Sequence, residues 1–415
     1  MCELSKRNIF IIILLALLFG SSSLITLGSF EYPLDPSILR LRYLLFGTGL
    51  IIFVLMSRLS MWDLPTQPKP LVFSWIFFSF FIFLSGYINN DITVMRDGIW
   101  FMIFIPIIFF SILPKLMNKY ATSLIPIGLF LGVTPYIVAS FVINPVWQSQ
   151  EGLYRGVFAN SNQLGFMAAV MSASIFIFLI SALSNNKGLF TIGILYLLLL
   201  LSLGVILLAN ARTSLLVFIV LHIMFLKKML QRPNYVIFSV ITVIFTILIA
   251  IFVIPNDIFS LLLEQISRIQ DKDSLSGREY IWLKTFIDMQ LLGNGSDYFE
   301  KNFGLGAHNT LIDILGINGI IAMLIIMFFA ISSFFYAFSY FQKYAKEEKY
   351  ASTPLIITTC FWVLSMGEGL FGSLGSAITI AYLLSMGVII TKKTTDNINH
   401  RFNNKEREKI YDFQV

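Results

Sequence analysis

Four arginines and one histidine stand out in a sequence that has few charged residues. Arg96 follows INNDITVM, Arg155 opens RGVFANSNQLG, and Arg212 lies in NARTS. Arg278 lies in SGREYIW, and His308 lies in GLGAHNT. A guanidinium binds phosphate oxygens in a bidentate manner, and a histidine, with an ordinary pKa of about 6.5, can accept a proton at neutral pH. Together these side chains could stabilise a leaving diphosphate while the histidine deprotonates an attacking hydroxyl.

Three of these residues also have plainer interpretations. Arg212 could extend its head group to lipid phosphates at the end of a helix. Arg278 could be an exposed arginine paired with Glu279 or Asp273, and His308 could stand beside a helix N-cap. The sequence leaves these alternatives open.

The sequence gives no support to a metal or nucleotide site. It contains no HExxH, CxxC or Walker A motif, and no second histidine stands at ligand spacing from His308. Its two cysteines, Cys2 and Cys360, offer neither a disulfide framework nor a Cys-based metal site. We therefore expect no metal, no cofactor and no nucleotide-driven pump.

The elements that must position these side chains are membrane helices. Of 415 residues, 57% are hydrophobic and 13% are charged, and the mean hydropathy is +0.81. A soluble domain would carry about a quarter charged residues. The net charge of +6 is spread over short loops and the tail, so it indicates topology and not nucleic-acid binding. The composition predicts an all-α polytopic membrane protein.

Hydropathy predicts about twelve transmembrane helices, since each span needs around 20 residues. The first is expected to be a retained helix and not a cleaved signal peptide, because no clear A-x-A site follows it. The expected spans lie near 8–29, 38–57, 71–88, 98–114, 122–143, 163–183, 188–208, 212–226, 234–255, 312–340, 353–369 and 375–391.

Lysine and arginine counts in alternate loops predict the orientation. Of the 29 such residues, 19 lie on the side of the N-terminus and 5 in short loops of the other side, while the remaining 5 lie in the long loop. Both termini are therefore expected to be cytoplasmic. The long polar loop, residues 255–309, is expected to face outward, and residues 392–415 to form a cytoplasmic tail.

The long loop is predicted to contain an amphipathic helix. Ser276 is a plausible N-cap and Gly293 a plausible C-terminal stop. Apolar residues recur between them at helical spacing: Ile281, Trp282, Phe286 and Met289. Arg278 in the first turn opposes the helix macrodipole, which favours an anion there. This placement suggests a phosphate bound jointly by the arginine and by free backbone N–H groups.

Four motifs occur in a fixed order over about residues 150–340: RGVFANSNQLG, NARTSLLVFI, SGREYIWLKTFI with LGNGSDYF, and GLGAHNTLIDILGINGIIA. Together they resemble the O-antigen ligase and polymerase superfamily of bacterial envelope proteins. The resemblance implies one membrane glycosyltransferase domain of the GT-C type, residues 1–415, in the bacterial inner membrane. It also implies a metal-independent reaction that uses an undecaprenyl-diphosphate-linked glycan on the periplasmic or outer face.

The resemblance also assigns roles by position. Arg212 and Arg278 match the arginines that bind the diphosphate, and His308 matches the histidine that activates the acceptor. Arg155 matches the basic residue that opens the Asn-containing motif. Further substrate-binding residues are expected at Asn160, Asn162, Asn309 and Arg96, although no motif around Arg96 matches.

Within the superfamily, the intact FANSNQLG motif favours an O-antigen or surface polysaccharide repeat-unit polymerase, because ligases are often more degenerate there. The alternative is an O-antigen ligase that transfers polymer to lipid A core. A second alternative is a flippase for lipid-linked glycan, which would place charges at the midplane of several spans. Expected partners are the lipid-linked oligosaccharide, a glycan or lipid A core acceptor, membrane lipids and a chain-length regulator.

Overall fold

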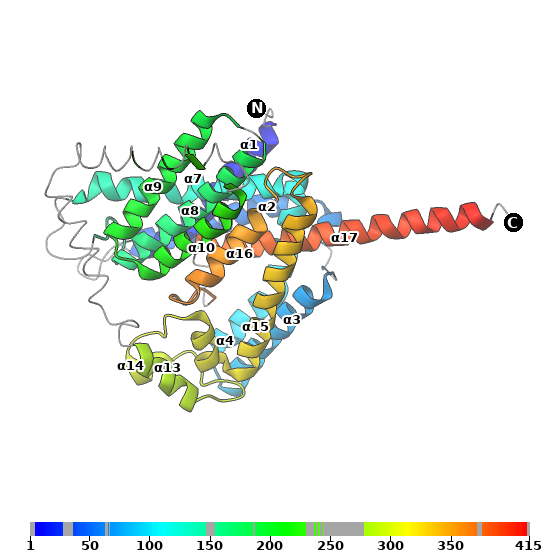
Figure 1. Cartoon of the computed structure of the whole chain (residues 1–415). Helices are drawn as coiled ribbons and strands as arrows, with labels where there is room; N and C mark the ends of the chain where they lie inside the picture. Colours follow the sequence, from blue (N-terminus) through cyan, green and yellow to red (C-terminus); the bar gives the residue numbers. More distant parts are fainter. Residues whose placement is uncertain are drawn as a thin grey trace.

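The computed structural model describes residues 5–27, 36–62, 67–146, 154–185, 187–229, 278–371 and 376–412, with a few single positions between these ranges. Within them the regular secondary structure is helical, apart from one isolated β-bridge between Leu27 and Phe158. Figure 1 shows the helices gathered into a bundle, with the last helix extending away from it.

The helices of the first half are α1 (Lys6–Ser23), α2 (Pro36–Met56), α3 (Lys69–Ile88), α4 (Ile92–Ile99), α5 (Ile105–Ile107), α6 (Leu113–Met117), α7 (Ala121–Ile143), α8 (Ser161–Ser184) and α9 (Leu189–Leu208). Two π-helical stretches, η3 (Trp100–Phe104) and η4 (Ile108–Ile112), join α4, α5 and α6. Short 3-10 turns are η1 (Leu24–Thr26), η2 (Leu59–Met61) and η5 (Asn118–Tyr120). The second half contains α10 (Arg212–Met229), α13 (Arg278–Ile287), α14 (Tyr298–Phe303), α15 (Thr310–Tyr344), α16 (Thr353–Leu364) and α17 (Ala377–Asp412).

Seven helical stretches in the described part of the chain are long and apolar enough to cross a membrane: Lys6–Ser23, Lys69–Ile88, Ile92–Ile143, Ser161–Ser184, Leu189–Leu208, Ile320–Tyr344 and Ala377–Thr395. Arg212–Leu226 and Thr353–Leu364 are shorter apolar helices. The protein is thus an all-α, multi-pass membrane protein, as its composition predicts. The expected span 234–255 lies almost wholly outside the described residues, and each of the other expected spans overlaps a helix.

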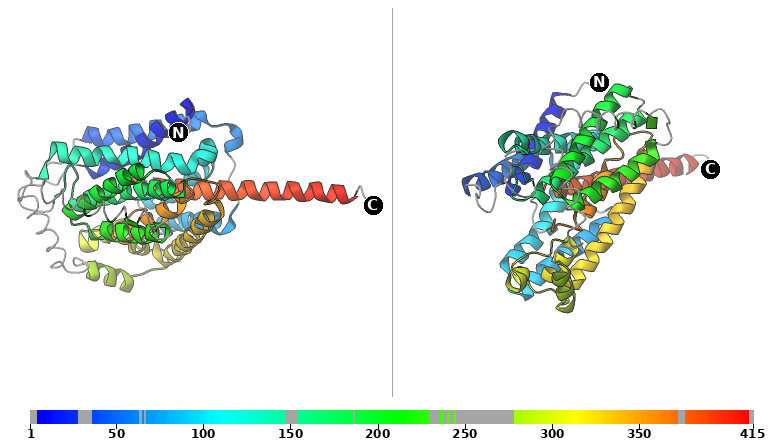
Figure 2. Two further views of the ribbon diagram at one scale, coloured as in Figure 1. Left: turned by 45° about the horizontal axis from the view of Figure 1, so that its top comes forward. Right: turned by 60° about the vertical axis from the view of Figure 1, so that its left-hand side comes forward.

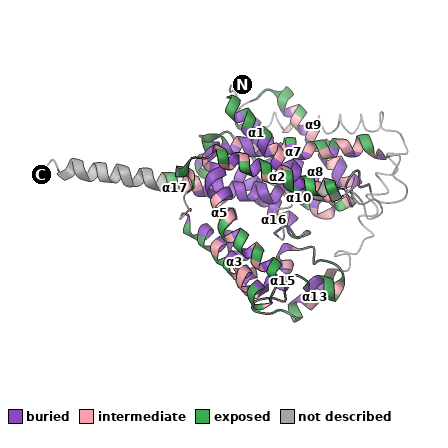
Figure 3. Cartoon of the chain, turned by 180° about the vertical axis from the view of Figure 1, so that it is seen from behind, coloured by how far each residue is buried: buried purple, intermediate pink, exposed green. Residues whose placement is uncertain are grey.

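The bundle packs around α8 and an aromatic centre on α3. α8 contacts α7, α9 and α10, and 94% of its apolar window is buried. α3 packs against α4 and α15, and its fully buried Trp75 is surrounded by the rings of Phe78, Phe101, Phe110, Phe329 and Phe371. Figure 2 shows α3, α4 and α15 beside the larger group of helices, and Figure 3 shows buried residues concentrated where α8, α10 and α16 meet.

One expected helix ends early. The span predicted over 353–369 is helical only to Leu364, after which residues 365–371 leave the helix axis. Glycines at 367 and 369 explain the departure, because each lies against a neighbouring side chain where a Cβ would collide. Gly367 lies against Thr213 at the start of α10, and Gly369 lies against Asp313 on α15. We refer to these residues as the 365–371 segment.

The amphipathic helix is also shorter than predicted. Its expected cap, Ser276, lies outside the described residues, as does the rest of 255–277, and α13 ends at Ile287 instead of continuing to Gly293. After α13 the chain turns toward α15. There Gly293, at φ 74°, packs against the kink in α15 at Gly319, where φ is 91°. A Cβ on either glycine would collide with backbone.

The kink in α15 therefore docks the loop 288–297 that follows α13. Asn294 N–H donates to the Gly316 carbonyl at 2.9 Å, and Ile320 N–H donates to the Gln290 carbonyl at 3.0 Å. Phe286 and Met289, which were expected on the apolar face, are both 49% exposed, whereas Ile281 is buried. The buried face of α13 is thus narrower than its sequence predicts.

Candidate functional site

Two of the predicted arginines line one cavity. The arginine pocket has a volume of about 150 Å³ and is lined by Arg212 and Arg278, by Asn162 at the start of α8, and by Met366, Gly367 and Glu368 of the 365–371 segment. Arg212 is the first residue of α10, and Arg278 is the first described residue of α13. The N-terminus of α10, whose free N–H groups favour anions, therefore opens into a cavity that also contains two guanidinium groups.

Arg212 is positioned by a tight turn between α9 and α10. Asn210 adopts φ 50°, a left-handed conformation that asparagine tolerates better than most residues. Gly165 of α8 packs so closely on Ala211 that a Cβ there would collide with its side chain. The turn is therefore held against the N-terminal end of α8, and Arg212 itself is half-buried.

Asn210 contributes a polar group that the sequence did not single out. Its side chain lines the arginine pocket and is 2% exposed, yet neither amide atom has a hydrogen-bond partner within the described part of the chain. Leaving a buried polar group unpaired costs about 1–3 kcal/mol. A ligand that both donates and accepts hydrogen bonds would offset this cost. The only signal in the sequence was its place in the NARTS motif.

Arg278 reaches the 365–371 segment. Its Nη1 donates to the Gly367 carbonyl at 3.2 Å, while the neighbouring Glu279 is exposed. α13 is fixed below it because Trp282 Nε1 donates to the Ala307 carbonyl at 2.9 Å and Ile281 is buried. Arg278 is thus held by the Gly367 carbonyl. It is not held by the pairing with Glu279 that the sequence allowed.

His308 contacts an acidic residue that the sequence analysis missed. Nδ1 of His308 lies 3.5 Å from Oε2 of Glu368, and the two side chains are 40% and 30% exposed. Glu368 was hidden within the predicted span 353–369. A carboxylate between two glycines in an apolar run was the available signal, because charged residues within such runs usually have a function.

A network of hydrogen bonds positions His308 and Glu368. The buried Thr310 hydroxyl donates to the Glu368 carbonyl at 2.9 Å and accepts from Leu370 N–H at 2.9 Å. Asn309, expected to bind substrate, is the N-cap of α15 and also donates to the Met366 carbonyl at 3.3 Å. The start of α15 and the 365–371 segment therefore form one rigid unit that carries His308.

Asp313 holds the backbone just before His308. Its Oδ1 accepts a hydrogen bond from Ala307 N–H at 3.1 Å. Asp313 precedes the kink at Gly319 and so lies outside the stretch Ile320–Tyr344 that could cross a membrane. Burial raises the pKa of Asp313 to about 6, an effect that the neighbouring Glu368 increases and the Ala307 hydrogen bond and His308 partly offset.

The remaining predicted residues lie elsewhere. Asn160 is the exposed N-cap of α8 and accepts from Gln163 N–H at 2.9 Å. Arg155 is half-buried in the turn before α8 and is not among the residues that line the arginine pocket. Arg96 is an exposed residue of α4, with its Nε 3.7 Å from Oδ1 of Asp97. The structure thus gathers Arg212, Arg278 and Asn162, and it places Asn309 beside His308.

No family model and no curated protein matches this chain. Two arginines, the N-terminus of α10 and an unpaired buried amide provide an anion site, and Glu368, on the segment that lines it, contacts His308.

Proposed function

We propose that the protein is a membrane glycosyltransferase that moves a glycan from an undecaprenyl-diphosphate carrier to a sugar hydroxyl, and that it acts as a surface polysaccharide repeat-unit polymerase. The observation that carries the proposal is the convergence of Arg212 and Arg278 on one cavity whose wall includes Glu368, the residue in contact with His308.

The arginine pocket suits the diphosphate of the donor. As the bond between the anomeric carbon and the diphosphate oxygen breaks, the electron pair remains on the diphosphate, whose charge increases. Charge-assisted hydrogen bonds from two guanidinium groups stabilise that charge, and the N-terminus of α10 adds to this stabilisation. The amide of Asn210 can both donate to and accept from the sugar diphosphate.

His308 suits the role of general base. With Nδ1–H directed at the Glu368 carboxylate, the Nε2 lone pair is available for the proton of the acceptor hydroxyl. The acceptor oxygen forms a bond to the anomeric carbon as the diphosphate leaves, and the proton passes to Nε2. The 3.5 Å contact with Glu368 tightens as the imidazole becomes positively charged.

We further propose that the chain crosses the bacterial inner membrane about twelve times, with both termini cytoplasmic and the site facing the periplasm or exterior. The bias of lysine and arginine toward one set of short loops supports this orientation. The start of α10, the start of α15 and the end of α16 all line the same site, as alternating crossings would require.

We propose membership of the O-antigen ligase and polymerase superfamily on the same grounds. Three of the four motifs that carry the resemblance, those containing Arg212, Arg278 and His308, converge on the site, and Asn162 of the remaining motif lines the arginine pocket. A flippase is less well supported, because such a protein places charges along its transport path, whereas these residues gather at one end of the bundle.

The deciding experiment is a reaction of the purified protein with defined lipid-linked repeat units, with and without lipid A core. Growth of the lipid-linked glycan is the expected result. Transfer to lipid A core instead would assign the ligase activity. Movement of intact lipid-linked units across liposomes, with no new glycosidic bond, would replace the proposal with a flippase.

A further inference from the structure

A second cavity begins where the arginine pocket ends. The acidic pocket has a volume of about 430 Å³, within the range of about 300–1,000 Å³ that is usual for small-molecule sites. Its wall continues the 365–371 segment through Gly369 and Phe371, whereas the arginine pocket uses that segment up to Glu368. The remaining walls come from α3, α4, the 296–306 loop and the first turns of α15.

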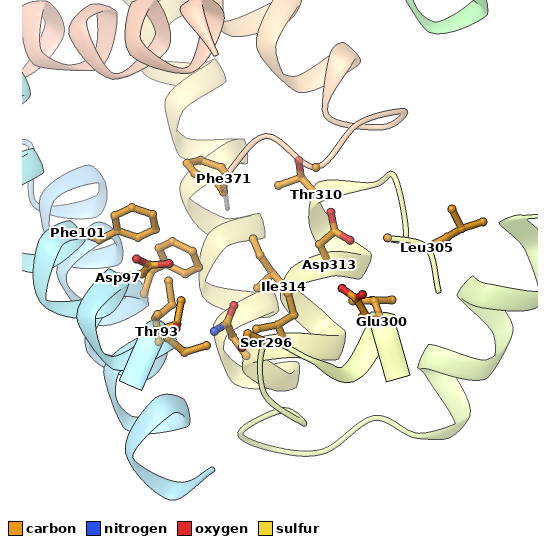
Figure 4. A pocket seen from close by; sticks show the side chains of 18 of the residues that line it. Thr93, Asp97, Phe101, Ser296, Glu300, Leu305, Thr310, Asp313, Ile314 and Phe371 are labelled. Atoms are coloured by element: carbon orange, nitrogen blue, oxygen red, sulfur yellow. The ribbon is translucent and has the colours of Figure 1, made fainter. Parts of the chain in front are cut away.

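The lining of this pocket is negatively charged. Figure 4 shows the carboxylate of Asp97 on one side of the space and those of Asp313 and Glu300 on the other. No lysine or arginine occurs among its described lining residues. Of the two nearest cations in sequence, Lys301 pairs with Asp297, and Arg96 contacts Asp97 from outside the lining with a side chain that is 62% exposed.

Other groups in the pocket match a sugar. Asn318 is 8% exposed and lines the cavity, and no hydrogen bond to its side chain occurs within the described part of the chain. An amide on a cavity wall can both donate to and accept from the hydroxyl groups of a ligand. The rings of Phe78, Phe101, Phe299 and Phe371 supply apolar walls for the C–H faces of a sugar ring.

Chain neighbours of His308 line the acidic pocket. Gly306 and Thr310, each two positions from His308, belong to its wall, whereas Glu368, the contact of His308, lines the arginine pocket. The chain segment that carries His308 therefore runs beside both cavities, although the histidine itself lines neither of them. A sugar in the acidic pocket can present a hydroxyl to His308 while a diphosphate occupies the arginine pocket.

We propose that the acidic pocket is a subsite for the accepting sugar, which selects neutral or amino sugars and rejects sugars that carry a carboxylate or phosphate substituent. This rests on the proposed function. Hydroxyl and ammonium groups donate hydrogen bonds to the three carboxylates, whereas an anionic substituent on the sugar in the pocket would be repelled by them.

The first measurement is binding without any donor lipid, by saturation-transfer NMR on the protein in nanodiscs. The probes are α-1,4-galactotriose and α-1,4-trigalacturonate, which carry a CH₂OH group and a carboxylate, respectively, at the same position. N-acetylated chitotriose is a second neutral sugar. The neutral probes should bind at least about tenfold more tightly than trigalacturonate, because like charges at a binding surface are strongly disfavoured.

The variant Glu300→Lys removes one carboxylate at an exposed position and adds a cation, so it should reduce that preference at least about threefold. Asp97→Asn is a milder second variant. Glu347→Gln, an exposed carboxylate beyond the other end of α15, is the matched control and should leave the preference unchanged. Equal binding of neutral and anionic probes by the unmodified protein, no binding of either neutral sugar, or an unchanged preference in Glu300→Lys would overturn the acceptor subsite.

The second measurement separates this proposal from the proposed function. Transfer from a lipid-linked donor is assayed with acceptors that carry the same neutral or carboxylate groups. Selective sugar binding without transfer would refute the glycosyltransferase and keep the sugar site. Transfer without discrimination between the two acceptors would keep the enzyme and refute the acidic pocket as the acceptor subsite.

Discussion

The arginine pocket and the acidic pocket share one wall but have opposite charge. The first is small, contains two guanidinium groups and receives the N-terminus of α10. The second is almost three times larger, carries three carboxylates and is walled by phenylalanine rings. A transferase needs this contrast, because its donor develops negative charge on a compact diphosphate while its acceptor is a bulkier polyol. Substitutions in either pocket, and at His308, test this contrast.

The largest effect is expected at the boundary. His308→Ala should reduce transfer about 10²–10⁴-fold, the usual contribution of a positioned general base. Binding of the donor should persist, because the arginine pocket does not include this side chain. Initial rates of transfer and donor affinity are measured in parallel. Wild-type transfer by the purified variant would remove the histidine from the mechanism.

On the acidic side, Asp313→Asn should change the pH dependence of stability. The pKa of Asp313 is raised from 3.8 to about 6, so the folded state holds its proton more tightly than the unfolded state. The resulting stabilisation is full below about pH 4 and is lost as pH rises through about 6. One pKa unit corresponds to about 1.4 kcal/mol, so the loss is about 3 kcal/mol.

Asp313→Asn retains an oxygen that can accept from Ala307 N–H but cannot ionise. Thermal unfolding of both proteins in detergent between pH 4 and pH 7 checks this. The unmodified protein should lose stability relative to the variant over that range. Parallel curves for the two proteins would show that Asp313 does not titrate in this window.

On the arginine side, Arg212→Lys and Arg278→Lys should each weaken donor binding and transfer about 10- to 100-fold. Lysine keeps the charge but cannot form two parallel hydrogen bonds to a phosphate, and a charged hydrogen bond contributes about 1.5–3 kcal/mol. Arg58→Lys, an exposed arginine between α2 and α3, is the matched control. Full activity of Arg212→Lys would indicate that Arg212 contacts lipid phosphates and does not bind the donor.

The smallest effect is expected for Glu368→Gln. The amide keeps the shape of the side chain but loses the charge that holds protonated His308, so kcat should fall about tenfold, which corresponds to about one hydrogen bond of free energy. The KM for donor should stay within about twofold. Glu368→Asp should recover part of the rate. A change confined to KM would make Glu368 a donor-binding residue and not a partner of His308.

The sequence predicted the scaffold better than the site. Apolar runs about 20 residues long determine where membrane helices form, so the long apolar helices of the described residues overlap the spans that hydropathy placed there, although their ends differ. Arg278 was found because a guanidinium in the first turn of a helix opposes the macrodipole and therefore indicates a ligand. Arg212 was found because a short turn between two spans places a guanidinium at the membrane boundary, where burial is costly. The meeting of these two arginines depends on the packing of α8, α10 and α16, which no local pattern encodes.

The acidic residues were harder to predict for a physical reason. Glu368 lay inside an apparently continuous apolar span, and hydropathy averages over a window longer than the break after Leu364. Asp97, Glu300 and Asp313 are far apart in sequence and seemed unrelated. Their proximity follows from the kink at Gly319 and the loop that docks into it, and both depend on tertiary contacts between glycines.

The two glycines on either side of Glu368 also limit how the protein can vary. Gly367 lies against the Thr213 side chain at the arginine pocket, and Gly369 lies against the Asp313 carboxylate at the acidic pocket, so a Cβ on either glycine would displace its neighbour. The wall shared by the two cavities is therefore little more than backbone at this point. Under the proposed function, a larger residue in place of either glycine would change the spacing between donor and acceptor.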